Sequence, residues 1–107
     1  MVEKNQEHSG SWAISLNNIV RKYFKENLPS FILTNETSHS PYWGVTYTLK
    51  DLEIRIGGDI GFDIDIFIDK KKYHLWQYDR NVINANDTNE VNILYQLNIL
   101  KHFLDGL

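Results

Sequence analysis

The residues best suited to chemistry in this chain are carboxylates that lie close together near its middle. Within residues 59–65, Asp59, Asp63 and Asp65 stand at a spacing loosely like that of a calcium-binding loop. Calcium needs about six to eight oxygen ligands that converge on one point, with a glycine where an EF-hand loop turns. Here isoleucine and phenylalanine fill the alternate positions, and Gly61 stands in the wrong place for that turn. We therefore interpret the acids as the solvated face of a half-buried strand, and we expect no metal and no other cofactor.

The same acids could also serve catalysis, but the geometry that catalysis needs is missing. Asp69 and Lys71 have the spacing of the acid and lysine in metal-dependent nucleases, which this segment loosely resembles, yet they fall at an expected hairpin tip. Asp63 and Asp65 could act as the paired carboxylates of a glycosidase, but on one strand face they lie about 7 Å apart with no cleft to desolvate one of them. His74 is expected to share that face with Asp65, and such a pair is more often structural than catalytic. We expect no catalytic residue, and hence no enzyme.

The composition of the chain is that of a globular protein and argues against several other classes of protein. At 107 residues the chain has the length of a single domain, residues 1–107, and 42% hydrophobic with 23% charged residues is ordinary for a globular protein. No apolar run approaches the roughly 20 residues that cross a bilayer, and the polar N-terminus lacks the apolar region of a signal peptide, so we expect a cytoplasmic protein with no membrane partner. The absence of cysteine excludes disulfides, thiolate zinc sites and cysteine nucleophiles. A net charge of −3 has the wrong sign for a nucleic-acid binder.

The elements that hold these acids are predicted from the spacing of apolar residues. Residues 1–10 are interpreted as a disordered lead-in, and Ser11 is expected to cap a helix over residues 12–27. A short strand at 31–34 and a polar loop at 35–41 come next. Alternation of apolar and polar residues then predicts four further strands, at residues 42–49, 52–56, 62–69 and 72–78. The sequence thus predicts an α+β fold, in which an antiparallel four- to five-stranded meander sheet is flanked by an N-terminal and a C-terminal helix.

Tight turns decide which residues oppose each other in this meander. A two-residue turn at 50–51 places Leu49 opposite Leu52, Tyr47 opposite Ile54 and Val45 opposite Ile56, so that apolar residues meet apolar residues. A turn formed by Gly57, Gly58 and Gly61 then leads to the second hairpin. A turn at 70–71 then places Ile66 opposite Leu75. The expected core face holds Trp43, Val45, Tyr47, Leu49, Leu52, Ile54, Ile56, Phe62, Ile64, Ile66, Ile68, Tyr73 and Leu75. The other face, here called the presented face, is expected to hold Thr46, Thr48, Glu53, Arg55, Asp63, Asp65, Phe67, His74, Trp76 and Tyr78.

The C-terminal helix carries more apolar residues than one sheet face requires. Asp87 or Thr88 is expected to cap it after a polar loop at 79–86, and it ends near Leu104. Its main apolar stripe is Ile93, Leu97, Leu100 and Leu104. A second, opposed stripe is Val91, Tyr95, Ile99 and Phe103. We expect this helix to lie between the sheet and the first helix, and the alternative is a homodimer interface through the second stripe.

The presented face combines carboxylates with aromatic rings. Aromatic side chains bury a large area at low entropic cost and often dominate protein interfaces. Clustered carboxylates speed association with a basic partner. We therefore expect a protein-binding surface made of Glu53, Asp59, Asp63, Asp65, Phe67, His74, Trp76 and Tyr78. A helix on each side of the sheet would cover this surface, and the sequence leaves that arrangement open.

In size, acidity, helix–meander–helix order and lack of catalytic residues, the whole chain resembles the immunity proteins of bacterial toxin systems, especially those of contact-dependent growth inhibition. These proteins share no sequence motif. The resemblance implies a cognate toxin domain, often a basic nuclease, whose active site the protein covers. Asp59, Asp63, Asp65, Trp76 and Tyr78 would then lie over the groups that the toxin uses to hold RNA or DNA. Two alternatives stay open: a small homo-oligomer of unknown role, and a domain that binds a small ligand between its sheet and helices.

Overall fold

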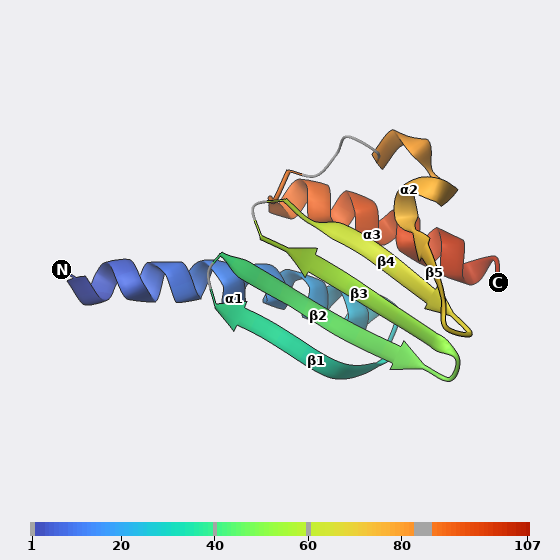
Figure 1. Cartoon of the computed structure of the whole chain (residues 1–107), viewed down its shortest axis with the longest axis horizontal. Coiled ribbons are helices and arrows are strands. Elements are labelled where there is room, and N and C mark those ends of the chain that lie inside the picture. The colour runs from blue at the N-terminus through green and yellow to red at the C-terminus, as the bar shows by residue number, and fades with distance from the viewer. Residues whose placement is uncertain (1, 40, 60, 83–86) are drawn as a thin grey trace.

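The computed structural model has two layers, a five-stranded sheet and a pair of long helices (Figure 1). It describes the backbone of residues 2–39, 41–59, 61–82 and 87–107, and the side chains of these from Trp12 onward. The elements in chain order are α1 (Val2–Asn27), β1 (Ile32–His39), β2 (Tyr42–Leu49), β3 (Leu52–Gly58), β4 (Asp63–Ile68), β5 (Lys71–His74), α2 (Leu75–Tyr78), a 3-10 helix (Arg80–Val82) and α3 (Glu90–Asp105).

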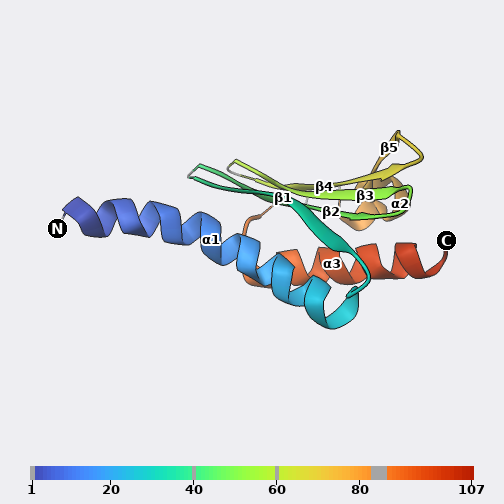
Figure 2. The same cartoon turned by 90° about the horizontal axis from the view of Figure 1, so that it is seen from below.

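The strands form one antiparallel meander in the order β1-β2-β3-β4-β5. Figure 2 shows α1 and α3 side by side on the same face of this sheet. The Tyr23 hydroxyl of α1 donates a hydrogen bond of 2.8 Å to Oδ1 of Asn98 on α3, which joins the two helices directly. The expected α+β fold, a meander sheet with an N-terminal and a C-terminal helix, is confirmed. The expectation that α3 lies between the sheet and α1 is wrong, because each helix contributes a buried stripe of its own to a single core.

The core fills the space between the sheet and the helices. Of the residues expected on the core face, those buried are Trp43, Val45, Tyr47, Ile54, Ile56, Phe62, Ile64, Ile66 and Leu75, and those half-buried are Leu49, Leu52, Ile68 and Tyr73. From α3, Ile93, Leu97 and Leu100 are fully buried. Between the layers, the ring of Phe24 on α1 stacks on Tyr47 of β2, with centroids 3.9 Å apart. Each such buried side chain contributes roughly 1.5–3 kcal/mol of transfer free energy.

Helix α1 begins at Val2, so the expected disordered lead-in and the expected cap at Ser11 are wrong. The segment before Ser11 contains glutamate, lysine and glutamine, which are good helix formers. Gly10 costs a helix interior only about 1 kcal/mol relative to alanine. That cost is too small to stop a helix whose later turns are packed against a sheet.

Strand β1 occupies most of the expected polar loop at 35–41, which is the largest difference from the sequence prediction. It pairs with β2 along its whole length, and a bulge between Leu33 and Asn35 accommodates one extra residue. Its residues are polar because it is an edge strand with one side in water. Backbone pairing with β2 holds it in the sheet without the apolar alternation by which strands are recognised.

The first hairpin has the expected register, and the second does not. Leu49 pairs with Leu52 across the β2–β3 turn as expected, and β3 then continues to Gly58, through the residues expected to turn. The second turn consists of Asp69 and Lys70, whose φ angles are 50° and 70°. A two-residue turn with both φ angles positive matches the twist of a hairpin, and aspartate tolerates such angles better than most residues.

The turn at Asp69 and Lys70 alters the pairing of β5 and the path of the chain beyond it. Ile66 pairs with Tyr73 instead of Leu75, and β5 ends at His74. The shift is by two residues, so Tyr73 and His74 keep their expected faces. Leu75 is buried as expected, but it is the first residue of α2 and not part of a strand. The expected strand over 75–78 is therefore wrong.

Helix α3 begins two residues later than expected. Asn89 is its N-cap, with Oδ1 accepting a hydrogen bond of 2.8 Å from the backbone N–H of Asn92. Asp87 and Thr88 precede the cap, and the carbonyl of Asp87 accepts from Nδ2 of Asn92 at 2.9 Å. Asparagine caps as well as aspartate does, so composition does not separate the candidates. Within the expected loop at 79–86, Arg80–Val82 form a 3-10 helix, and residues 83–86 lie outside the described residues.

Candidate functional site

The sheet face opposite the helices carries most of the residues expected on the presented face. We call it the open face, since neither α1 nor α3 covers it (Figure 2). In the strand registers its residues are Asn35, Thr37, Gly44, Thr46, Thr48, Glu53, Arg55, Gly57, Asp63, Asp65, Phe67, Lys72 and His74. The expected uncovered face is therefore present, and one of its rows crosses all five strands as Asn35, Thr46, Arg55, Asp65 and His74.

Asp65 is the most engaged acid of the open face. Its Oδ1 lies 2.7 Å from Nδ1 of His74, and its Oδ2 lies 3.7 Å from Nζ of Lys72. The His74 ring stacks on Trp76, with centroids 5.3 Å apart and an interplanar angle of 9°. The backbone N–H of His74 donates to Oε1 of Gln77 at 2.7 Å, which closes the start of α2. His74 thus shares a face with Asp65, as expected.

Arg55 neutralises part of the acidic surface. Its Nε lies 2.5 Å from Oε2 of Glu53, and its guanidinium carbon lies 4.5 Å from the centre of the Phe67 ring. With Lys72 and His74 beside Asp65, the open face is a mixed surface in which several acids already have cationic neighbours. Asp63 is exposed and forms no ion pair with the residues that the structure describes.

Three expected binding residues lie outside the strands of the open face. Trp76 belongs to α2, but its stacking on His74 keeps it beside that face. Tyr78 is elsewhere: its ring contacts Phe103 of α3 edge-on, with centroids 5.0 Å apart. Asp59 comes directly after the end of β3 and lines a hollow in the sheet. The expectation that Trp76 and Tyr78 belong to a strand of the presented face is wrong, because the chain enters α2 after His74.

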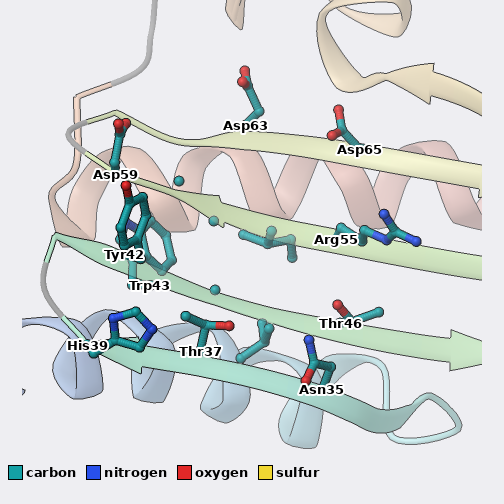
Figure 3. Close-up of a pocket in the computed structure, with 15 residues that line it drawn as sticks. Asn35, Thr37, His39, Tyr42, Trp43, Thr46, Arg55, Asp59, Asp63 and Asp65 are labelled. Atoms are coloured by element: carbon teal, nitrogen blue, oxygen red, sulfur yellow. The ribbon is translucent and has the colours of Figure 1, made fainter.

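The hollow has a volume of about 520 Å³ and lies on the open face near the start of β2 (Figure 3). Thr37, Gly44, Gly57 and Asp63 form a single row across its four strands. The two glycines in the middle of that row carry no side chain, so backbone forms the floor. Figure 3 shows side chains around this floor, and they come from all four strands and the turn after β3: Asn35, Thr37, His39, Tyr42, Thr46, Arg55, Asp59, Asp63 and Asp65.

The glycines of the floor are required by the close approach of β2 and β3. A Cβ on Gly57 would lie 2.3 Å from the carbonyl oxygen of Trp43 and 2.5 Å from Cα of Gly44. A Cβ on Gly44 would lie 3.0 Å from the carbonyl oxygen of Ile56. Larger residues at either position would therefore force the strands apart, and the hollow is built into the backbone.

Asn17 supports the hollow from the core side. It is fully buried. Its Oδ1 accepts from the Gly44 N–H at 2.9 Å, while its Nδ2 donates to the Thr37 carbonyl at 2.8 Å and to Glu36 Oε2 at 3.2 Å. A signal was available in the sequence, since position 17 continues the helical spacing of the buried Ala13, Val20 and Phe24.

Among the described residues, no group of three or more histidine, cysteine, aspartate or glutamate side chains could hold a metal ion. In the same part of the chain, no helix is long and apolar enough to cross a membrane. Comparison of the chain with protein-family models, curated proteins and solved structures found no match. Function therefore has to be inferred from the surface itself.

Proposed function

We propose that this chain is a protein-binding module, and specifically an immunity protein that binds a cognate bacterial toxin domain through the open face. The observation that supports this is the placement of both long helices on one side of the sheet, which leaves the other side uncovered (Figure 2). A five-stranded sheet normally buries at least one face and has no structural need to expose aromatic rings on the other. Phe67 and Trp76 on or beside the open face suit a partner that covers them.

The open face has the size of a protein interface. Strands spaced about 4.8 Å apart and up to eight residues long give a face of roughly 20 by 25 Å. Side-chain relief raises this area toward the roughly 800 Å² that one partner contributes to a stable complex. A smaller patch would support only a transient contact.

The charges of the open face set the chemistry of the partner. Arg55, Lys72 and His74 are each paired with an acid of the same face, whereas Asp63 remains exposed. A partner with a basic surface gains from the remaining carboxylates during approach. Toxin nucleases hold phosphates with basic groups, so a carboxylate surface placed over those groups would block substrate. In this proposal the protein acts in the cytoplasm and needs no catalytic residue or cofactor.

The test is growth protection combined with binding. The chain is tagged in its host, its stoichiometric protein partner is identified, and that partner is expressed alone and together with the chain. We expect the partner to stop growth alone and to be tolerated in the presence of the chain. Asp63→Lys should lower the association rate by about tenfold at low salt, and Asp51→Lys, at the exposed β2–β3 turn, should not. Protection that both variants retain in full would rule out the open face as the binding surface.

A second candidate, a homodimer, is favoured by one observation on α3. Val91 is 80% exposed and Tyr95 is 44% exposed, and Tyr78 of the neighbouring α2 is 49% exposed. Ile99 and Phe103 complete this stripe and are half-buried. Sedimentation of the purified chain distinguishes the homodimer from the open-face binding module. If the chain is a dimer and Val91→Glu makes it a monomer, the chain associates with itself through this stripe of α3, independently of the open face.

A further inference from the structure

We propose that the hollow on the open face receives one basic side chain, an arginine or a lysine, from the surface of the partner protein. This inference rests on the proposed function, because it names the chemical group that the open face recognises. Three properties of the hollow lead to it: the shape, the distribution of charge and the nature of the rim.

The shape of the hollow leaves room for an inserted side chain. The row of Thr37, Gly44, Gly57 and Asp63 has its two glycines in the centre, so the sheet is deepest there. The volume of about 520 Å³ lies within the range of small-ligand pockets, about 300–1,000 Å³. Asn17, beneath the floor, holds the Gly44 N–H and the Thr37 carbonyl in place. A preformed recess of this kind lowers the entropic cost of binding.

The charge inside the hollow is negative. Three carboxylates line it, those of Asp59, Asp63 and Asp65, and of these Asp65 already lies against His74 and Lys72. Arg55 also belongs to the lining, but Glu53 and the Phe67 ring hold its guanidinium. Figure 3 shows the Arg55 side chain running along β3, away from Asp59. Because Arg55 is held in this way, its charge does not cancel that of Asp63, and a cation from outside fits where an anion would be repelled.

The rim supplies the remaining contacts of a cation site. Tyr42 stands at one end of the hollow and is 52% exposed, and the ring of His39, which also lines the hollow, contacts it edge-on with centroids 5.8 Å apart. An aromatic ring attracts an arginine or lysine head placed over its face. On the β1 side, Asn35 and Thr37 present amide and hydroxyl oxygens that can accept hydrogen bonds from the same head. Carboxylates on one wall and neutral acceptors on the other match a guanidinium, which only donates hydrogen bonds.

The experiment uses a probe that does not depend on the identity of the toxin. The ¹⁵N-labelled full chain is titrated with the capped tripeptide acetyl-Gly-Arg-Gly-amide, and separately with its citrulline counterpart, which has the same shape without the charge. We expect the amide chemical shifts of Gly44 and Gly57 to change when the arginine peptide is added and to remain unchanged when the citrulline peptide is added. Gly106, at the end of α3, should stay in both. Equal shifts with the two peptides, or shifts confined to other residues, would overturn the proposal.

Two variants locate the responsible charge. Asp63→Asn should weaken binding of the arginine peptide about tenfold, since it removes a charged acceptor. Asp51→Asn removes the same charge from the far end of β2 and should leave the binding unchanged. The amide spectrum also shows whether each variant is folded. Equal effects of the two variants would reduce the interaction to net charge and would overturn the proposed site.

The outcomes separate this inference from the proposed function. If the arginine peptide leaves Gly44 and Gly57 unmoved while the toxin complex still depends on the open face, the inference is wrong and the proposed function stands. If the peptide binds in the hollow while no partner depends on the open face, the cation site stands and the proposed function is wrong.

Discussion

Replacement of Asn17 by alanine should be among the most damaging polar substitutions in this chain. Asn17 is the side chain that ties α1 to the neighbouring strands β1 and β2 beneath the hollow. It accepts from the Gly44 N–H at 2.9 Å and donates to the Thr37 carbonyl at 2.8 Å. Alanine keeps the helix but offers neither group to the strands.

The expected loss can be estimated from the groups left behind. Each buried backbone group that loses its partner costs about 1–3 kcal/mol, and Asn17→Ala affects two of them. The third hydrogen bond, to Glu36, counts for less because that carboxylate also pairs with Arg21 at 3.5 Å and keeps this partner when Asn17 is replaced. Alanine recovers roughly 0.5 kcal/mol through its higher helix propensity. The sum is a loss of about 3 kcal/mol, from a total stability of about 5–15 kcal/mol.

The assay is urea unfolding monitored by far-ultraviolet circular dichroism, with Asn18→Ala as the matched control. Asn18 is the next residue of the same helix and is exposed, so its replacement should change the stability by less than about 0.5 kcal/mol. In thermal unfolding, Asn17→Ala should lower the Tm by about 12 °C or more. Asn17→Asp should be at least as harmful at neutral pH, since a carboxylate cannot donate to the Thr37 carbonyl.

A small effect would refute this reasoning in a defined way. Thr37 and Gly44 are register partners in β1 and β2. If Asn17→Ala lost less than about 1 kcal/mol, the Gly44 N–H and the Thr37 carbonyl would have to be satisfied without the asparagine. The side chain would then be a filler of the core, and the floor of the hollow would not depend on it.

Three further perturbations test the layers and turns of the fold. Ile66→Ala removes a core residue that is 1% exposed and should lower stability by about 2–5 kcal/mol. Asp63→Ala on the open face should change stability by less than about 0.5 kcal/mol. Equal losses of stability in urea unfolding would contradict the assignment of the two faces. Lys70→Gly relieves a φ of 70° and should raise stability by about 1 kcal/mol, seen as a higher Tm. Burial raises the pKa of the Tyr47 phenol, so the unfolded chain releases that proton first and stability should fall as the pH rises above about 10; Tyr47→Phe should reduce this alkaline loss, and Tyr42→Phe at an exposed ring should not.

The parts of the fold that the sequence predicted are those where side-chain pattern and backbone pairing agree. Strand β2 and the β2–β3 register could be predicted because every second cross-strand step pairs apolar with apolar residues, as in Tyr47 with Ile54. Strand β1 could not, since it is polar and its pairing is supplied by β2. The position of the second turn could not be predicted either. A turn at Asp69 and Lys70 and a turn at Lys70 and Lys71 consist of equally polar residues. Only the backbone angles separate these choices.

The sequence predicted several residues of the open face but not the hollow that they surround. Alternation placed Asp63, Asp65 and Phe67 on the uncovered face, since a period of two assigns faces directly. The hollow needs two glycines in register on different strands and a fourth strand, β1, beside them. None of these can be read from local pattern, because register and strand order depend on contacts far apart in sequence. Asn17 was missed for a related reason: a buried polar residue resembles an exposed one until its partners are known.

The interleaving of the two faces also bears on how such a chain can diverge. Along β2, β3 and β4, residues that hold the core together alternate one by one with residues that meet solvent. Exchanges at the solvent-facing positions other than Gly44 and Gly57 cost little stability, whereas those at the buried positions are removed by selection. Descendants of this chain can therefore acquire new surface chemistry on an unchanged scaffold. Selection can then change the partner that is recognised without first having to rebuild the fold.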